Sequence, residues 1–391
     1  MADICTINRR LSSLAVFGGV RKKPLFALFL DYCDKAAGTP EKELAYGAFI
    51  NEIYSGGASL TDCVRRIVFE DENVYVRTVG KKHEVNPHVA RAVEYELRAL
   101  SEFASLTPDD FASDMEHKNY VHSFDSERVD LVAEYSSRIA SIEKYGYGIF
   151  ASHGMFSVSD EGIITPIISA DKTSLEKFVG YEDERNKIIH NTEMFLSGKP
   201  AANALLYGDA GTGKSSTVKA VANRFFDDGL RLIELRKDQL LLLPLVMGEI
   251  SDNPLRFIIF IDDLSFNQND DSFSMLKATL EGSACARAKN SVIYATSNRR
   301  HIVRECFSDR ENDVHRNDSV QENLSLSERF GLTVLFAKPE KKLYLEIIRE
   351  LAERYSIDKP TEELEREAEA FALKRGYRSA RAAEQFIESL L

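Results

Sequence analysis

An eight-residue motif in the middle of the chain combines the residue types that bind phosphate groups. It fits the pattern G-x-x-x-x-G-K-[ST] and consists of Gly208, Asp209, Ala210, Gly211, Thr212, Gly213, Lys214 and Ser215. Glycines let the backbone N–H groups of such a loop converge on phosphate oxygens. The lysine can then reach the β- and γ-phosphates, while the serine hydroxyl binds Mg²⁺. The motif therefore predicts a site for a nucleoside triphosphate and its magnesium ion.

The segments on either side of the motif support this prediction. Residues 204–207 are a short apolar run, and residues 216–222 have a pattern typical of a helix. Such a helix directs the positive end of its dipole at the phosphates, with Ser216 in its first turn. A glycine-rich turn without a ligand is the alternative, and a strand before the loop with a helix after it favours the phosphate site.

Strand and helix signals alternate from residue 203 onward, which predicts an α/β fold with a parallel sheet between two layers of helices. Five short apolar runs are the predicted strands: 204–207, 230–235, 257–261, 292–295 and 333–336. Ligands of such sheets bind at the carboxyl ends of the strands. Polar residues that follow these runs are therefore the next candidates.

Two carboxylates follow the third run directly. The pattern predicts that Asp262 helps to hold Mg²⁺ and that Asp263 orients the attacking water. An ordinary acidic loop at a strand end is the alternative. Hydrolytic enzymes of this type often carry the longer Glu in the second position, so Asp263 predicts slow hydrolysis. Glu281 is a weaker candidate for the base that acts on the attacking water. The alternative for Glu281 is an ordinary acidic residue on the surface of a helix.

Two more polar residues lie close to the later runs. Asn298 follows the fourth run, where it could contact the γ-phosphate or the attacking water, and capping of the next helix is a compatible alternative. Arg329 precedes the fifth run, and its planar charged group suits the transition state of phosphoryl transfer. From the edge of the sheet it would serve a neighbouring subunit's nucleotide. An ordinary surface ion pair is the alternative.

Residues 338–391 are predicted to form about three helices from their apolar periodicity. The last of these helices has Ser379 as a suitable N-cap. An arginine at the start of that helix could reach back over the phosphates. Arg381 is the first candidate and Arg378 the second, with solvated helix arginines as the alternative.

Residues 1–170 contain no chemical motif that we can identify, and they are predicted to form a mainly helical domain. The clearest helix begins at Asn86 and Pro87, a capping residue and a residue suited to the first helical position. A small hairpin is predicted at the end of this domain from the strand-like segments 148–151, 155–158 and 162–165. The predicted domains are therefore 1–170, 171–337 and 338–391.

The composition is that of a globular protein that dissolves in water. The net charge of −12 gives no support for non-specific binding to DNA or to anionic membranes. The five cysteines are widely spaced without a C-x-x-C pair, so we expect reduced thiols instead of disulfides or a zinc site. No apolar run approaches the roughly 18 to 20 residues that cross a bilayer. We therefore expect a cytoplasmic protein without membrane contact.

The ordered set of motifs resembles the AAA+ ATPase superfamily, near its branch of bacterial replication initiators and helicase loaders. The set comprises the phosphate loop, the Asp-Asp strand, the Asn-ending strand, an Arg-Phe-Gly segment and a small helical domain. A bacterial family of predicted AAA+ ATPases, labelled a domain of unknown function, is similar at residues 262–266, 294–301 and 325–332. The resemblance covers about residues 175–391.

This resemblance implies a five-stranded parallel sheet of order 5-1-4-3-2 with a C-terminal helical lid. It implies ATP and Mg²⁺ as cofactors, with Val179 and Gly180 near the adenine. It also implies a homo-oligomer in which Arg329 acts on a neighbour's nucleotide and Arg381 on its own. The expected activity is Mg²⁺-dependent ATP hydrolysis that drives an assembly or remodelling switch. An unidentified protein partner would bind through residues 1–170.

Two other functions remain open. A nucleotide-dependent scaffold would bind ATP and hydrolyse little of it, which Asp263 in place of Glu favours. A DNA-associated loader is suggested by the branch resemblance and by Arg299, Arg300 and His301. Against the loader, no helix-turn-helix domain follows the predicted lid.

Overall fold

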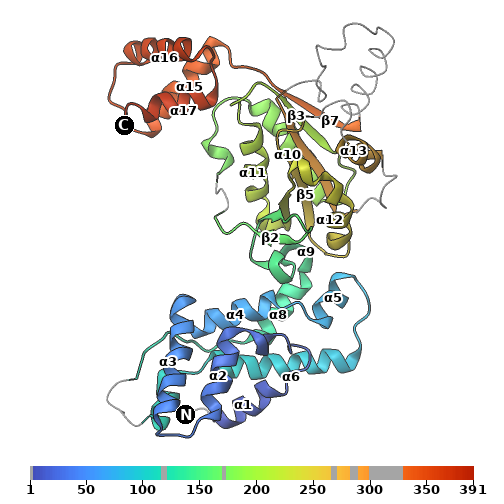
Figure 1. The fold of residues 1–391 in the computed structure, drawn as a ribbon, viewed down its shortest axis with the longest axis vertical. Coiled ribbons are helices and arrows are strands. Elements are labelled where there is room, and N and C mark those ends of the chain that lie inside the picture. Colours follow the sequence, from blue (N-terminus) through green and yellow to red (C-terminus); the bar gives the residue numbers. More distant parts are fainter. Residues whose placement is uncertain (1–2, 116–120, 170–172, 266–270, 282–288, 299–328) are drawn as a thin grey trace. The chain divides into compact units, whose positions relative to one another are not determined.

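The computed structural model describes residues 3–115, 121–169, 173–265, 271–281, 289–298 and 329–391 (Figure 1). The chain divides into two compact units, Met1–Ser152 and His153–Leu391. The boundary differs from the predicted limit at residue 170. The reason is that strand β1, which begins at Met155, pairs with a strand of the second unit.

The described part of the first unit consists of helices and their connections, with one isolated β-bridge between Ser59 and Asp125. Its α-helices are α1 (Ile4–Ser12), α2 (Pro24–Asp34), α3 (Pro40–Ser55), α4 (Leu60–Glu70), α5 (Val74–Gly80), α6 (Pro87–Ala104), α7 (Pro108–Phe111), α8 (Leu131–Ala140) and α9 (Ile142–Tyr145). Its 3₁₀ helices are η1 (Val20–Lys22), η2 (Ala112–Asp114) and η3 (Gly148–Ala151). The predicted start of α6 is confirmed, because the side chain of Asn86 accepts the N–H of His88 at 2.9 Å.

Aromatic rings from several helices form the centre of this unit. The ring of Phe29 in α2 lies 4.5 Å from that of Phe103 in α6 and 5.7 Å from that of Phe49 in α3. All three side chains are fully buried. Rings at such distances add to the stabilisation that comes from apolar burial, so this cluster joins α2, α3 and α6 into one core.

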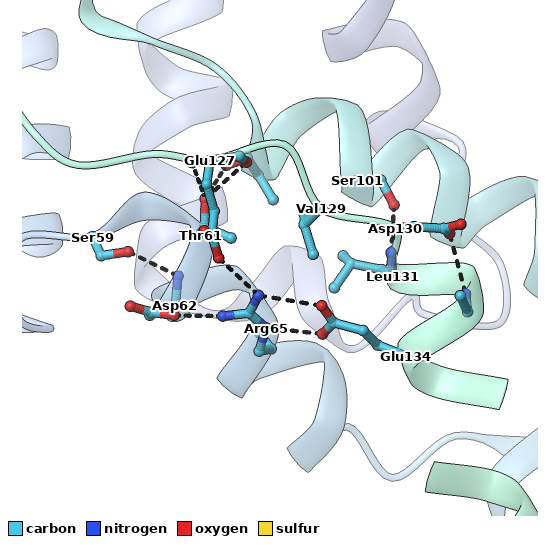
Figure 2. A network of polar contacts seen from close by, with 12 residues as sticks. Ser59, Thr61, Asp62, Arg65, Ser101, Glu127, Val129, Asp130, Leu131 and Glu134 are labelled. Carbon is cyan, nitrogen blue, oxygen red and sulfur yellow. Dashed lines mark hydrogen bonds and ion pairs between the residues drawn. The ribbon is translucent and has the colours of Figure 1, made fainter. Parts of the chain in front are cut away.

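Polar contacts fix the segment before α8 against α4 and α6 (Figure 2). Thr61 of α4 accepts the N–H of Glu127 at 3.0 Å, and Ser101 of α6 accepts the N–H of Leu131 at 3.0 Å. Arg65 of α4 forms ion pairs with three carboxylates, those of Asp62, Glu127 and Glu134. These groups bond to one another within the unit, so they serve its stability.

One predicted strand of this region is wrong. Residues 148–151 form the 3₁₀ helix η3 instead of a strand. Gly146 and Gly148 both have a positive φ, of 63° and 62°, and this left-handed geometry interrupts an extended strand.

A seven-stranded sheet lies at the centre of the second unit, counted over the residues that the structure describes. Its strands are β1 (Met155–Val158), β2 (Ile164–Pro166), β3 (Ala204–Gly208), β4 (Leu230–Glu234), β5 (Arg256–Ile261), β6 (Ser291–Ser297) and β7 (Leu332–Phe336). The five predicted apolar runs all form strands, β3 to β7. All neighbouring pairs are parallel except β1 and β2, which are antiparallel.

The prediction of five strands requires correction, whereas the five predicted strands, β3 to β7, do follow the order 5-1-4-3-2. The sheet has the order β2-β1-β4-β5-β6-β3-β7, in which β1 and β2 extend it beyond β4. Met155 and Phe156 of β1 are buried, and Phe156 pairs with Ile233 of β4. The hairpin assigned to the N-terminal domain therefore completes the sheet, because joining β4 covers its apolar side chains.

Helices cover both faces of the sheet (Figure 1). Helices α10 (Glu182–Leu196) and α11 (Lys214–Arg224) lie on one face, and α12 (Leu243–Ile250) and α13 (Asp271–Glu281) on the other. Short 3₁₀ helices complete the connections: η4 (Leu175–Lys177), η5 (Phe226–Asp228) and η6 (Lys237–Leu242). This arrangement agrees with the predicted α/β class.

The last three helices have a small core of their own. They are α15 (Lys341–Arg354), α16 (Thr361–Arg375) and α17 (Ala380–Glu388). Ile348, Ala368, Ala383 and Ile387 are fully buried among them. The expected helical region is confirmed. No helix in the described ranges has the length and apolar character needed to span a membrane.

Candidate functional site

Backbone geometry requires glycine at three positions of the loop between β3 and α11. Gly208 has a φ of 135°, and a Cβ there would lie 2.1 Å from the carbonyl oxygen of Phe336. Gly211 and Gly213 have φ values of 76° and 87°, in the left-handed region that favours glycine. The loop thereby turns from the sheet into α11, which begins at Lys214.

Lys214 is buried with its charge, at 6% exposure. Its Nζ donates to the carbonyl oxygens of Gly208 at 3.0 Å and Asp209 at 2.7 Å, and to Oδ1 of Asn298 at 3.2 Å. Burial lowers the pKa of this ammonium, and the carboxylates of the site oppose that shift. An ammonium held by neutral oxygens can exchange them for the stronger charged acceptors of a phosphate.

The first turn of α11 provides further donors. The first N–H groups of a helix have no partner within it, and they carry the positive end of the dipole. Ser215 and Ser216 lie in this turn. Ahead of it, Thr212 is buried and donates its hydroxyl to the carbonyl of Asp209 at 2.9 Å, while Asp209 and Ala210 are exposed. This geometry suits an anion above the loop.

The carboxylate of Asp262 joins the ends of three neighbouring strands. Its Oδ1 accepts the hydroxyl of Ser215 at 2.6 Å, the hydroxyl of Thr296, and the N–H of Asp263 at 3.1 Å. The first donor follows β3, the second lies in β6 and the third follows β5. Asp262 therefore lies beside Ser215, the other residue that the sequence predicts to bind Mg²⁺.

Asp263 and Asn298 meet at the exposed side of this cluster. Asp263 has a φ of 52°, unusual for a residue other than glycine, and its Oδ1 accepts the side-chain N–H of Asn298 at 2.8 Å. Both residues are exposed, so a small molecule can reach them from solvent. Strained backbone of this kind occurs mainly at functional sites, where the surroundings enforce it.

The residues present fit the implied magnesium nucleotide. Ser215 and Asp262 offer a hydroxyl and a carboxylate oxygen within hydrogen-bond distance of each other, and hard oxygen donors are what Mg²⁺ prefers. No group of three His, Cys, Asp or Glu with metal-ligand placement occurs in the described part of the chain. A site with few protein ligands is typical of Mg²⁺ that is also bound by phosphates.

Arg329 lies at the other end of the sheet. Leu332, three residues later, pairs with Ala204 at the start of β3. Phe336, at the end of β7, pairs with Gly208 at the phosphate loop. Because strands rise about 3.3 Å per residue, the start of β7, which Arg329 precedes, lies roughly 13 Å along the strand from the phosphate loop.

The two candidate arginines of the C-terminal helices have different environments. The backbone N–H of Arg381 donates to the carbonyl of Gly211 at 3.2 Å, which places the start of α17 on the phosphate loop, and its side chain is exposed. Arg378 forms two hydrogen bonds of 2.8 Å with Glu369 of α16. Of these two arginines, Arg381 is the one whose backbone contacts the phosphate loop, and its role toward a ligand stays a prediction.

Comparison with known proteins agrees with this geometry. Residues 151–391 match the model of a family described as "Protein of unknown function (DUF815)". The match covers more than half of the chain. The chain belongs to this family.

A curated relative extends the comparison to a larger protein. It is "Chaperone protein ClpB 2" of Parasynechococcus marenigrum (strain WH8102), 28% identical over 206 residues. The match covers 48% of this chain and 21% of that protein, so the chain spans about a fifth of the relative's length. Family match and similarity together identify an AAA+ protein of the DUF815 family, and the predicted resemblance is confirmed.

In this DUF815 member, the segment with Val179 and Gly180 lies beside the C-terminal helices. Val179 packs against their core, and a Cβ on Gly180 would lie 2.5 Å from Leu343 of α15. Tyr181 donates its hydroxyl to the carbonyl of Ala337 at 2.6 Å. The segment therefore contacts the connection between sheet and lid, and its role at adenine stays a prediction.

Sequence reasoning assigned no role to Thr296, and it predicted Ser379 as an N-cap, which is confirmed, but not its place beside the phosphate loop. Thr296 bonds to both aspartates, and Ser379 lies beside Gly211, where an added Cβ would be 3.1 Å from its hydroxyl. Thr296 lies in β6, two residues before Asn298, which follows that strand, and this spacing was the available signal. The side chain of Glu281 and residues 299–301 lie outside the part that the structure describes.

Proposed function

We propose that the chain binds ATP and Mg²⁺ at the loop before α11 and uses the nucleotide to drive an assembly or remodelling switch on a protein partner. One observation carries this proposal. Five residues from three separate strand ends form two bonded groups, Ser215 with Asp262 and Lys214 with Asn298 and Asp263, which the backbone N–H of Asp263 joins. Such convergence of one ammonium with hard oxygen groups suits a magnesium triphosphate.

Each of these residues has a distinct task in the proposed reaction. Lys214 neutralises phosphate charge, and Ser215 with Asp262 holds the metal, which when bound withdraws charge from the phosphate oxygens. Asp263 accepts a proton of the attacking water, and Asn298 keeps that carboxylate in place. The activity is thus an ATP hydrolysis whose base is one carbon shorter than the usual Glu.

The lid supports a switch as the output of this reaction. Arg381 contacts the loop at Gly211, and the carboxylate of Asp209 accepts the N–H of Lys338 at 3.0 Å in the connection to α15. Two points of the phosphate loop are therefore bonded to the lid or its connection. A phosphate that displaces these bonds would change the angle between sheet and lid, which is a hinge movement.

Neighbouring copies would complete each other's sites. Arg329 lies at the end of the sheet away from the loop of its own chain, as the pairing of β7 with β3 indicates. An arginine placed there can stabilise phosphoryl transfer only on the nucleotide of another copy. We therefore propose a homo-oligomer whose turnover depends on Arg329, with the first unit as the candidate partner-binding region.

A scaffold that hydrolyses little is the second candidate. It is favoured by Asp263, whose carboxylate is already engaged by Asn298 at 2.8 Å. A DNA-associated loader has less support, since the net charge is −12.

Steady-state phosphate release tests the proposal against the scaffold. Wild-type chain should release phosphate with a rate per chain that rises with protein concentration, because sites form between copies. Arg329→Ala should bind ATP as wild type does and release phosphate at least about tenfold more slowly. Arg366→Ala, an exposed arginine of the lid, is the matched control and should behave as wild type. Negligible release at every concentration would favour the scaffold.

A further inference from the structure

Thr296 lies near the end of β6, and its side chain is 2% exposed. Its strand pairs with β5 on one side and β3 on the other, so the residue sits between the strands that carry the aspartates and the phosphate loop. The hydroxyl proton is donated to Oδ1 of Asp262, and the oxygen accepts the N–H of Asp263 at 3.0 Å. One hydroxyl thus bonds to both members of the Asp-Asp pair.

These two bonds act on a strained turn. The backbone at Asp263 is left-handed, with a φ of 52°, and this turn directs its carboxylate to Asn298. The carbonyl of Thr296 also accepts the N–H of Leu264 at 2.7 Å. Thr296 therefore fastens the residues before, within and after the turn to β6. Strain of this kind persists only where the surroundings hold it.

We propose that Thr296 is a positioning residue that sets the carboxylate of Asp262 for the metal and the turn of Asp263 for the attacking water. This inference rests on the nucleotide site proposed above. Without the hydroxyl, the Oδ1 of Asp262 would lose a donor, and the Asp263 N–H would lose its bond to β6. Asp263 could then relax toward ordinary backbone geometry, away from Asn298.

Two substitutions separate the hydroxyl from the shape of the side chain. Thr296→Val keeps the shape and removes both bonds, whereas Thr296→Ser keeps the hydroxyl. Thr192→Val is the matched control, because Thr192 is also fully buried and bonds to Tyr294 of β6 at 2.8 Å, away from the aspartates. Each variant is titrated with fluorescent ATP in EDTA and at increasing Mg²⁺, and phosphate release is then measured.

We expect Thr296→Val to bind ATP in EDTA as wild type does, because the phosphate loop is unchanged. It should need about tenfold more Mg²⁺ for half of the metal-dependent gain in affinity, and its kcat should fall about 10- to 100-fold with little change in KM. Thr296→Ser should recover both properties to within about threefold, and Thr192→Val should match wild type. If Thr296→Val does not fold, Thr296→Ala is judged by the same readouts.

The two proposals fail in different ways. A wild-type chain that binds no ATP overturns the nucleotide site. A wild-type chain that binds Mg²⁺-ATP, with a Thr296→Val variant of equal Mg²⁺ requirement and equal kcat, overturns the positioning role alone. A Thr192→Val variant that loses as much as Thr296→Val assigns the loss to general destabilisation and also contradicts the inference.

Discussion

Glu96 in the first unit and Lys214 in the second are both buried charged residues that bond to backbone atoms, but they are held differently. Glu96 accepts the N–H groups of Ala15, Val16 and Phe17, which lie 79 to 81 positions away in the sequence. Lys214 donates to backbone carbonyls only five and six positions away, in its own loop. The first set of bonds joins distant backbone segments, and the second is local. The one distant bond of Lys214 is to the exposed side chain of Asn298, another residue of the site.

This difference separates a structural charge from a ligand-binding one. The bonds of Glu96 fix the segment after α1 against α6, so they cannot be lost without disturbing the core between them. The bonds of Lys214 to its own loop can be exchanged for ligand oxygens while the core stays in place. Burial of a charge alone does not distinguish these two cases, whereas the sequence separation of its backbone partners does.

The largest expected effect is on nucleotide binding by Lys214→Ala. The variant loses the one ammonium that the loop places on the phosphates, so affinity for Mg²⁺-ATP should fall at least about 100-fold. Its free energy of unfolding should change little without ligand, because the lost bonds are to its own loop and to the exposed side chain of Asn298. Titration calorimetry and urea unfolding on the same preparation measure both quantities. A variant that unfolds easily and still binds ATP would reverse the comparison.

Glu96→Ala should give the opposite result. Three backbone N–H groups lose their acceptor, so the first unit should be destabilised by about 3 kcal/mol. Affinity for ATP should not change. Glu94→Ala on the same helix is the control, because Glu94 is exposed and forms a surface ion pair with Arg98, so its cost should be below about 0.5 kcal/mol. Urea unfolding followed by circular dichroism compares them, and equal costs would contradict the structural role.

The two lid arginines sharpen the comparison within one unit. Arg381→Ala should lower phosphate release about tenfold, because its exposed side chain begins beside Gly211 of the phosphate loop. Arg378→Ala should lower the free energy of unfolding by about 1 kcal/mol through loss of its two bonds to Glu369, with turnover nearly unchanged. Thermal unfolding and phosphate release, measured on both variants, show which arginine acts on the ligand and which stabilises the lid. Exchange of the two phenotypes would make Arg378 the ligand-facing residue.

The smallest expected effect concerns Asp71, a buried carboxylate of the first unit. Burial raises its pKa above the usual value, so the folded state binds more protons and loses stability as the pH rises through that pKa. Asp71→Asn removes this loss. The free energy of unfolding of Asp71→Asn, relative to that of wild type, should be higher at pH 7 than near pH 4. Urea unfolding of both proteins at these two pH values measures the difference. An advantage that grows toward acid pH would contradict this sign.

The sequence predicted the local parts of the site well. The spacing of the phosphate loop, the aspartates after β5 and the asparagine after β6 are short-range patterns, and parallel strands bring their ends to one edge of a sheet. The predicted side chains do meet, since Ser215 bonds to Asp262 and Asn298 to Asp263.

Features that depend on tertiary contacts were not predictable in this way. The pairing of β1 with β4 joins segments more than 70 residues apart, and nothing in the 155–166 hairpin specifies that partner. The bonds of Thr296 depend on the turn at Asp263, which no local pattern encodes. The choice between Arg378 and Arg381 required the position of Glu369, which only packing of α16 against α17 provides.

Calorimetric titration of the wild-type chain, residues 1–391, with ATP, in Mg²⁺ and again in EDTA, tests the central claim most directly. We predict saturable binding of one nucleotide per chain that is tighter when Mg²⁺ is present. Absence of saturable binding under both conditions, in a chain whose unfolding curve shows that it is folded, would contradict the account.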